Sequence, residues 1–276
     1  KAVQAKRLKI PAASCRVSAR FRGSDRIRMQ PLPEAKTDDI PHSRFAALIP
    51  VYNHEQTVAD VVQRTLKLGI PVVVVDDGST DATFERIKGI NGARVLRHRF
   101  NRGKGAAIMT GFAEVAKIAD WAITLDADGQ HDPEDAKTLI RAIPENQRPI
   151  VIGKRQGMLA PDVPWTSRFG REFSNFWVRM AGGPAVADSQ SGFRAYPLPE
   201  CLHLGVSARR FQFEVEVLVK ARWSQMPVAE VPVRVSYRPG TRRISHFHPF
   251  FDFLRNTGLF SRLITHRILT CRFRGH

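Results

Sequence analysis

Short apolar runs alternate with amphipathic segments along the chain from Phe45 onwards. The apolar runs predict buried strands, at 45–51, 71–75, 94–96, 121–125 and 150–153. Apolar residues at helical spacing predict helices between them, from about 55 and at about 80–88, 106–119 and 134–143. Strands that alternate with helices are typical of an α/β fold with a mainly parallel sheet flanked by helices. Polar turn residues follow the strands, so we expect the loops to meet at one rim of the sheet.

The second half of the chain continues with longer helices. We expect one helix through 168–180 and another at 211–223, followed by a strand at 228–235. Pro232 cannot donate a hydrogen bond to a neighbouring strand, so this strand is predicted at an edge of the sheet. The tail at 249–270 has apolar residues at helical spacing, interrupted by arginines. It either packs on the core or lies in a membrane interface with its arginines at the headgroups.

The start of the chain differs from the rest. Residues 1–43 are rich in Arg and Lys, contain four prolines and lack hydrophobic periodicity, which predicts a basic, disordered extension. An acid-poor leader with Arg and Ser also resembles an organelle transit peptide, although no cleavage signal is visible. We therefore divide the chain into this extension, a main α/β domain at 44–247 and an amphipathic helical tail at 248–276.

Charge and cysteine content narrow the partners and the location. The 276 residues carry a net charge of +17, which implies anionic partners such as nucleic acid, phosphorylated substrates or an anionic lipid surface. Three scattered cysteines cannot form a disulfide framework, which is typical of a reducing compartment, and we predict a cytoplasmic location. No apolar run is long enough to cross a bilayer, so any membrane association is predicted to be peripheral, at the cytoplasmic face.

Two carboxylates follow the central predicted strand. Asp126 and Asp128 are two residues apart in an extended segment, so both side chains point into one volume at the strand's carboxyl end. They repel each other unless a cation lies between them. A hard divalent cation with oxygen ligands would remove the repulsion and keep positions open for substrate phosphates. The alternative is a pair of solvated turn aspartates, because Asp is common in loops.

Other rim residues suit a nucleotide. Tyr52 offers a ring on which a base could stack, whereas Glu55 and Asp77 offer hydrogen-bond acceptors. Lys104, between two glycines at a predicted helix start, suits a phosphate. The alternatives are a helix-start glutamate at Glu55 and an ordinary turn with a helix cap around Asp77. Neither a Walker loop nor the G-x-G-x-x-G dinucleotide fingerprint occurs.

Six strings together resemble the family 2 glycosyltransferases with the GT-A fold, a Rossmann-like α/β fold. The resemblance is strongest to the catalytic domains of dolichol-phosphate mannosyltransferases and polyprenyl-phosphate glycosyltransferases. The strings are Ile49-Pro-Val-Tyr52-Asn53, Val75-Asp-Asp77-Gly-Ser-Thr-Asp81, Asn101-Arg-Gly-Lys-Gly105, Asp126-Ala-Asp128-Gly-Gln130-His131, Asp188-Ser-Gln-Ser191-Gly192-Phe193-Arg194 and Phe213-Glu-Val-Glu216. Their order over residues 45–247 is far more specific than any single string.

The resemblance implies roles for individual residues on the donor side. The nucleotide sugar would be bound by Pro50, Tyr52, Asn53, Glu55, Val75, Asp77, Lys104, Asp126 and Ala127. A Mg²⁺ or Mn²⁺ ion that bridges the diphosphate would be held by Asp126, Asp128 and Gln130. The chain departs from the usual pattern at His54, which separates Asn53 from Glu55, where such synthases carry Glu directly after the Asn.

The acceptor is inferred from absent motifs and abundant cations. Family members with hydroxyl acceptors commonly carry a Glu-Asp pair and an aromatic Gln-x-x-Arg-Trp motif further along the chain. Here a Glu-Asp pair occurs only at Glu134-Asp135, directly after the aspartate turn, and the Gln-x-x-Arg-Trp motif does not occur. A phosphate monoester is already ionised at neutral pH, so it needs cations rather than a base. For this acceptor site the resemblance singles out Arg155, Arg168, Arg238 and Ser245, and we expect Arg171 and Ser191 to contribute to it. Arg194 is expected to join this basic set, for which the alternative is a solvated basic face.

One predicted helix carries two glutamates close to these strings. Glu214 and Glu216 are about 200° apart around a helix, so only one of them can face the site. We expect that one to be Glu214.

These observations predict a metal-dependent, inverting glycosyltransferase that moves a sugar from a nucleotide diphosphate sugar to a lipid phosphate at a membrane surface. Catalytic roles are predicted for Asp126, Asp128, Gln130, Arg155, Arg168 and Arg238. Transfer to a hydroxyl of a glycan or glycolipid is an alternative, as is an inactive scaffold domain. A basic nucleic-acid-binding domain would explain the charge, but its clustered aspartates would repel phosphates, so no nucleic acid is expected.

Overall fold

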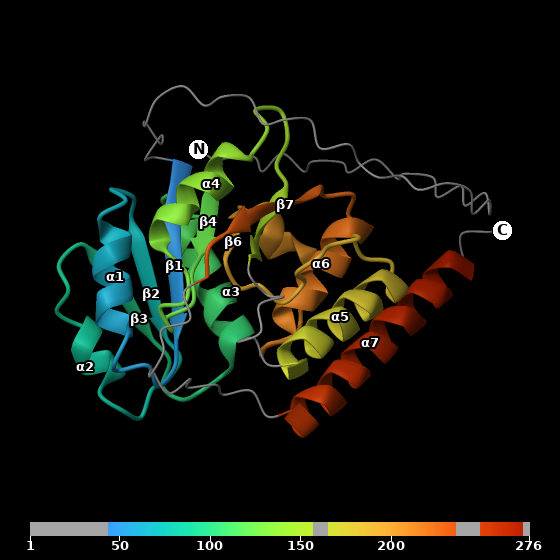
Figure 1. Cartoon of the computed structure of the whole chain (residues 1–276), viewed down its shortest axis with the longest axis horizontal. Helices are drawn as coiled ribbons and strands as arrows, with labels where there is room; N and C mark the ends of the chain where they lie inside the picture. Colours follow the sequence, from blue (N-terminus) through green and yellow to red (C-terminus); the bar gives the residue numbers. More distant parts are fainter. Residues whose placement is uncertain (1–43, 157–164, 236–248, 273–276) are drawn as a thin grey trace, which may run out of the picture.

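One seven-stranded sheet organises the computed structural model, which describes residues 44–156, 165–235 and 249–272, without the side chains of 165–169, 249–256 and 270–272. The strand order is β3-β2-β1-β4-β6-β5-β7 (Figure 1). The strands are β1 Phe45–Val51, β2 Val72–Asp76, β3 Ala93–Arg97, β4 Trp121–Thr124, β5 Ile150–Arg155, β6 Arg194–Pro197 and β7 Val228–Val233. Only β6 runs antiparallel to its neighbours, so the predicted mainly parallel sheet is confirmed.

Each face of the sheet carries its own core, because alternate strand residues point to opposite faces. In β1, Ala47 and Ile49 pack in one cluster, whereas Ala46 and Leu48 pack in the other. The first face is covered by α1 (Val58–Leu66), α2 (Thr83–Ile87) and α4 (Ala136–Arg141). The second face is covered by α3 (Lys104–Val115) and α6 (Phe213–Trp223). Burial on both faces explains why the strands appear in the sequence as continuous apolar runs.

A third cluster joins α5 (Trp165–Met180) and α7 (Pro249–Arg272) to the side of α6 that faces away from the sheet. Val178, Val219 and Leu263 are buried in it, one from each helix. The tail therefore packs on the domain over part of its length, which is one of its two predicted alternatives. Within the described ranges, no helix combines the length and the apolarity that a bilayer crossing requires.

The structure differs from the prediction mainly at β6. This strand has only four residues and begins with a charged arginine, so it lacks the apolar run that signals a strand. It nevertheless lies between β4 and β5 in the middle of the sheet. By contrast, β7 contains Pro232 and is the last strand in the order, so its predicted edge position is confirmed.

Gly111 of α3 packs so closely on β1 that an added Cβ would overlap the methyl carbons of Leu48. We expect Gly111→Val to lower the free energy of unfolding by about 2 kcal/mol, because overpacking displaces core side chains. Gly258 of α7 has open space at its Cβ position. As the control, Gly258→Val should change stability by less than about 0.5 kcal/mol. Denaturant titration measures both values, and equal losses would contradict the packing argument.

Candidate active site

The loops after β1 and β2 are fastened to each other at the carboxyl end of the sheet. The side-chain oxygen of Asn53 accepts a hydrogen bond from Thr80 N at 2.8 Å, and Asn53 N donates to Ser79 Oγ at 3.0 Å. Glu55 Oε2 accepts from Ala82 N at 2.9 Å. Asn53 has a φ of 53°, in the left-handed region that Asn adopts more readily than most residues. Asn53 and Glu55 therefore stabilise the two loops, and their contacts with a nucleotide stay predictions.

Asp77 is buried and faces into the protein. Its Oδ1 lies 2.6 Å from His98 Nδ1, and its Oδ2 accepts from Gly103 N at 2.7 Å. Arg102 N also donates to Oδ1 at 3.0 Å. Asp77 thus fixes the loop that leads into α3, and with it the position of Lys104. Its predicted contact with a nucleobase or ribose stays a prediction.

Three other predicted nucleotide-binding residues are buried in the sheet layer. Pro50 and Val75 lie in β1 and β2, and Ala127 follows β4. Val75 and Ala127 belong to the two core clusters, so their side chains support the rim from below. Tyr52 is half-buried at the rim.

Lys104 is the electrostatic centre of the site. Its Nζ lies 2.7 Å from Asp126 Oδ1 and 2.8 Å from Glu214 Oε1. Burial alone would lower the pKa of Lys104, but the two carboxylates raise it above the usual lysine value. Gly192 packs directly on this group, because a Cβ there would lie 2.6 Å from Asp126 Oδ2 and 2.7 Å from Lys104 Nζ. A larger residue at 192 would displace the ion pair.

The two aspartates of the site have pKa values shifted in opposite directions. Burial acts to raise the pKa of Asp126, but the Lys104 ammonium outweighs it and holds this pKa below its usual value. Burial, reinforced by the charge of Asp126, raises the pKa of Asp128. Asp128 Oδ1 accepts from Gln130 N at 3.0 Å, which closes the turn. The protein therefore balances one carboxylate internally and leaves the other unbalanced.

His131 lies buried beside the aspartates. Its ring packs on Phe193 with the centroids 5.1 Å apart, and burial lowers its pKa. Its Nδ1 has no hydrogen-bond partner among the residues that the structure describes. The sequence does not indicate this burial, because the histidine follows a polar turn.

The donor groups at the aspartates fit a divalent cation. In the described part of the chain, no three His, Cys, Asp or Glu side chains converge to hold a metal ion. Asp126, Asp128 and the Gln130 side chain nevertheless offer the oxygen ligands that Mg²⁺ and Mn²⁺ prefer. Mg²⁺ commonly takes only one or two protein carboxylates and completes its shell with water and phosphates. The raised pKa of Asp128 marks a charge that such an ion would neutralise.

A second charged cluster lies beside the aspartates. Arg155 donates two hydrogen bonds of 2.8 Å to the carboxylate of Asp188, which is fully buried. Glu230 accepts from Asp188 N at 2.9 Å and so fixes the backbone. Burial acts to raise the pKa of Asp188, but Arg155 and, more weakly, Arg171 lower it. Arg155 also helps to lower the pKa of Asp126 against the effect of burial, so the two clusters are neighbours.

Two residues predicted near the acceptor lie in the interior instead. Arg194 is fully buried, and its guanidinium donates to the carbonyl oxygens of Ser189, Ser191 and Glu214 at 2.8, 2.7 and 2.8 Å. Because it begins the central strand β6, it points inward, and its predicted place in the acceptor's basic set is wrong. Ser191 is buried too, and its hydroxyl donates to Gly153 O at 2.7 Å. It supports the end of β5 rather than facing an acceptor.

Part of the predicted acceptor site falls outside the described residues. The side chain of Arg168 in α5 lies there, as do Arg238 and Ser245 entirely. Of the predicted acceptor cations, Arg155 and Arg171 are the two whose side chains the structure places. Their contacts with an acceptor stay predictions.

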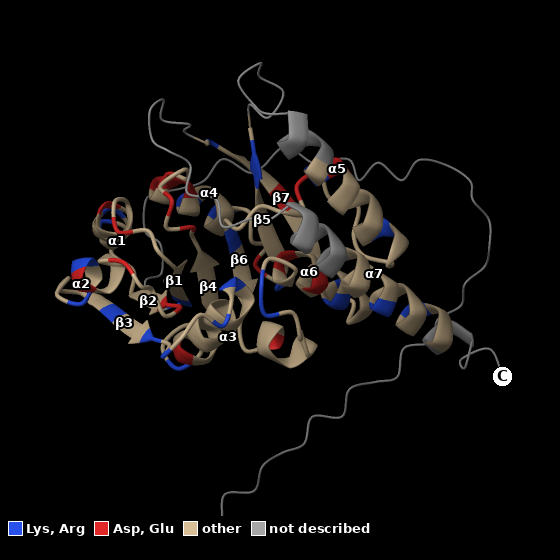
Figure 2. Cartoon of the chain, turned by 90° about the horizontal axis from the view of Figure 1, so that it is seen from below, with Lys and Arg blue, Asp and Glu red and all other residues tan. Residues whose placement is uncertain are grey.

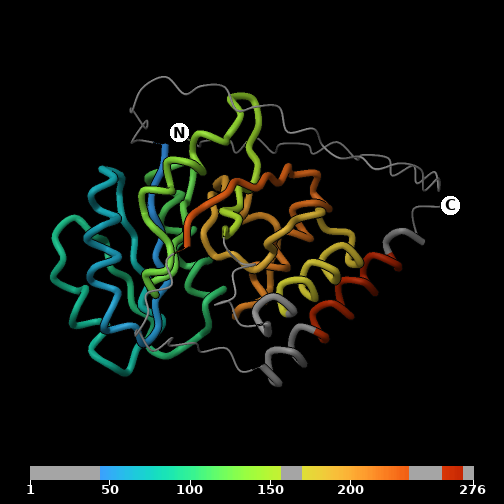
Figure 3. Tube along the Cα trace, in the orientation of Figure 1, coloured from blue at the N-terminus to red at the C-terminus, as the bar shows by residue number. Residues whose placement is uncertain are grey.

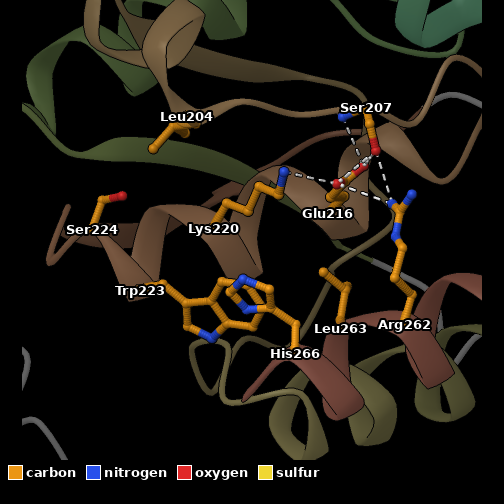
Figure 4. Close-up of a pocket in the computed structure, with 9 residues that line it drawn as sticks. All are labelled: Leu204, Ser207, Glu216, Lys220, Trp223, Ser224, Arg262, Leu263 and His266. Carbon is orange, nitrogen blue, oxygen red and sulfur yellow. Dashed lines mark hydrogen bonds and ion pairs between the residues drawn. The ribbon is translucent and has the colours of Figure 1, made fainter. Parts of the chain in front are cut away.

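The two glutamates of α6 face different sites, and the expectation for Glu214 is confirmed. Glu214 pairs with Lys104, whereas Glu216 accepts from Ala208 N at 2.6 Å and pairs with Arg262 of α7 at 3.2 Å. Glu216 lines a separate cavity of about 440 Å³ between α6 and α7 (Figure 4). Ser207 and Lys220 also interact with its carboxylate there. The ion pair with Arg262 connects α7 to the rest of the domain.

The acidic partners of the second cluster were not predicted. Asp188 lies in one of the family strings, and Glu230 interrupts an apolar strand sequence. An acidic residue among buried apolar neighbours signals a paired carboxylate, since unpaired charges are rarely buried. That signal does not identify the partner, because the pairing depends on where the strands lie in the sheet.

Residues 46–196 match the family model described as Glycosyl transferase family 2. The chain is 30% identical to the UDP-N-acetylglucosamine–dolichyl-phosphate N-acetylglucosaminyltransferase of Methanococcus voltae over 69% of this chain and 84% of that protein. It is 28% identical to the polyprenol monophosphomannose synthase of Mycolicibacterium smegmatis over 72% of this chain and 79% of that protein.

Solved structures show the same fold at low sequence identity. Glucosyl-3-phosphoglycerate synthase from Mycobacterium tuberculosis in complex with UDP is 20% identical, with a TM-score of 0.61 over 82% of this chain and 80% of that one. The same synthase with Mn²⁺, UDP and phosphoglyceric acid gives a TM-score of 0.58 over 83% of this chain and 78% of that one. The sheet described above therefore has the GT-A arrangement. Because the family match covers more than half of the sequence, the chain belongs to glycosyl transferase family 2.

Proposed function

We propose that this protein transfers a sugar from a nucleotide diphosphate sugar to the phosphate of a polyprenyl or dolichyl phosphate, with inversion at the anomeric carbon. The observation that carries this proposal is the acidic pair Asp126 and Asp128 beside the cationic cluster of Arg155 and Arg171. The first group suits a metal-bound diphosphate, and the second suits an anionic acceptor. The names of the two relatives above describe transfers of this kind, which supports the proposal.

On the donor side, Asp126, Asp128 and Gln130 would hold Mg²⁺ or Mn²⁺, which when bound supplies positive charge for the leaving diphosphate. The Mn²⁺ in a structure of similar fold supports this assignment. Lys104 lies 2.7 Å from Asp126 and keeps that carboxylate ionised and in place before any ligand arrives. The fastened loops after β1 and β2 would frame the nucleotide.

On the acceptor side, the state of the nearby carboxylates favours a phosphate over a hydroxyl. A hydroxyl acceptor needs a general base to remove its proton. Asp188 and Glu214 are buried and held in ion pairs by Arg155 and Lys104, so neither suits that role. A phosphate monoester is already ionised at neutral pH, and it would attack from the face opposite the leaving diphosphate. The arginines beside Asp188 would orient it through charge-assisted hydrogen bonds.

The direct test supplies radiolabelled UDP-N-acetylglucosamine, UDP-glucose or GDP-mannose together with a polyprenyl phosphate and Mn²⁺ or Mg²⁺. We expect one donor to transfer its label into the organic phase. The matched control is the polyprenyl alcohol, which lacks the phosphate and should accept no sugar. Transfer to the alcohol, or to a glycan hydroxyl instead, would contradict the proposed acceptor.

Asp128→Asn should reduce transfer by about 100-fold or more, because it removes one of two carboxylates that hold the ion and diphosphate. The same variant should be more stable than the wild type in EDTA by about 1 kcal/mol, because it removes a partly buried charge that Asp126 repels. Thermal melts and initial rates measure both effects. Asp60→Asn, at an exposed acid of α1, should change neither value. A destabilised Asp128→Asn protein would contradict the repulsion argument.

The raised pKa of Asp128 also predicts a pH dependence. Ionisation of this carboxylate is unfavourable in the folded protein, so the metal-free protein should gain stability as the pH falls through the raised pKa. Mn²⁺ binding in the presence of UDP should weaken over the same range, because the ion competes with a proton. This range should lie above about 3.9, the ordinary pKa of an aspartate. Calorimetric titration over a pH series measures it, and Asp128→Asn should flatten the profile.

Arg171→Gln should raise the KM for a short-chain polyprenyl phosphate by about tenfold, because it removes one cation from the acceptor side. The KM for the sugar nucleotide should stay within about twofold of the wild type. Arg86→Gln, at an exposed arginine of α2, is the control and should change neither constant. A rise in the KM for the sugar nucleotide alone would contradict the prediction, because it would assign Arg171 to donor binding rather than acceptor binding.

A further inference from the structure

Four large apolar side chains are exposed on two neighbouring helices. Phe176 and Met180 of α5 are 54% and 48% exposed, and Ile268 and Leu269 of α7 are 55% and 49% exposed. We call these four residues the α5–α7 face. A concentration of exposed apolar side chains on one part of a protein marks an interaction surface, whereas isolated ones do not.

The two helices run side by side (Figures 1 and 3). The ring of Trp177 of α5 stacks on the ring of Phe260 of α7, with the ring centroids 5.8 Å apart. The ring of Phe176 packs edge-on against Trp177, with the centroids 5.3 Å apart. Near the end of α5, Arg267 donates a hydrogen bond to Met180 O at 2.9 Å. These contacts place Phe176 and Met180 of α5 beside the part of α7 that begins at Phe260.

The apolar line on α7 continues past the point where the helix is covered. Phe260, Ile264 and Ile268 are four residues apart and therefore lie on one side of the helix. Phe260 is buried, Ile264 is half-buried and Ile268 is exposed. The red end of α7 extends beyond α5 in Figure 1. A helix that only packs on its own domain would not need apolar residues there.

The charge around this face indicates its partner. No Asp or Glu follows Asp252 in the sequence, and arginines recur along the described part of α7 (Figure 2). Arg179 of α5 is exposed as well. Glu172, one turn before Phe176, is an exposed acid on α5, but basic side chains outnumber acidic ones on the described parts of the two helices. Apolar side chains in such a mainly basic surrounding fit a surface of anionic lipid headgroups. A second copy of the chain would present the same positive charge and be repelled.

We propose that the α5–α7 face docks on an anionic lipid surface. The inference rests on the proposed function for the lipid nature of the acceptor, and it adds the surface by which the protein reaches that lipid. Arg171 and Phe176 are five residues apart on α5, about 140° around the helix. Docking through Phe176 would therefore hold the acceptor-side cation Arg171 on the part of α5 that faces away from the lipid, toward Asp188.

Flotation of the full chain with vesicles tests this without a sugar nucleotide. We expect binding to vesicles of phosphatidylglycerol and phosphatidylcholine, weakened by salt, and little binding to phosphatidylcholine alone. Phe176→Ser and Ile268→Ser should each weaken partition to the anionic vesicles by roughly tenfold. Ile118→Ser removes an apolar side chain that is 44% exposed in the turn after α3, away from α5 and α7, and should have no effect. All variants share residues 1–43, so their differences report on the face.

Three outcomes would overturn the proposal. Binding that is equal in all variants would assign it to the basic charge alone, and equal binding to neutral vesicles would exclude the headgroup argument. A concentration-dependent dimer that Ile268→Ser dissociates, without vesicle binding, would make the face a contact between two copies.

A second assay separates this inference from the proposed reaction. With a short, water-soluble polyprenyl phosphate, Phe176→Ser and Ile268→Ser should transfer sugar at wild-type rates, whereas with a long-chain acceptor in anionic vesicles their rates should fall by roughly tenfold. Absence of transfer to either acceptor by the wild type would reject the proposed function and leave the vesicle-binding result standing. Equal loss with both acceptors would show that the substitutions disturb the active site.

Discussion

Repulsion between Asp126 and Asp128 is the constraint to which the rest of the site responds. Both side chains follow β4, at the centre of the sheet, where they are partly buried and charges interact more strongly than in bulk water. Lys104 neutralises Asp126 from 2.7 Å, which leaves Asp128 with a raised pKa. A fully balanced site would gain stability but would have no unmet charge with which to attract a cation and a diphosphate. The charge of Asp128, which no cation among the described residues neutralises, is thus the property that would allow the site to bind a metal ion.

Several buried groups fix the position of Lys104. Glu214 shares its ammonium, and Arg194 holds the carbonyl oxygen of Glu214 at 2.8 Å. Asp77 fixes the backbone of Gly103 immediately before Lys104. These groups lie in β6, in α6, in the loop after β2 and directly before α3, so the position of one ammonium depends on several separate elements of the fold. Each is a buried charge that would be costly alone and is tolerated because it is paired or hydrogen-bonded.

The sequence predicted what depends on local pattern. The apolar runs correctly predicted the parallel strands, and Pro232 correctly predicted the edge position of β7. The spacing of Glu214 and Glu216 correctly predicted that their side chains point to different sites. It did not predict β6, because a four-residue strand that begins with Arg194 has no apolar periodicity. Nor did it predict that Asp188 would bind Arg155. Such pairings join residues far apart in the chain, and only the strand order brings them together.

One helix connects the donor site to the proposed lipid surface. Glu214 on one side of α6 binds Lys104, and Glu216 on the other side binds Arg262 of α7. Val215 and Val219 of α6 pack in the same cluster as α5 and α7. Because α6 is buried along most of its length, it acts as a rigid element rather than a flexible linker. Docking of α7 on a membrane would therefore orient the donor site through α6 without any movement of the sheet.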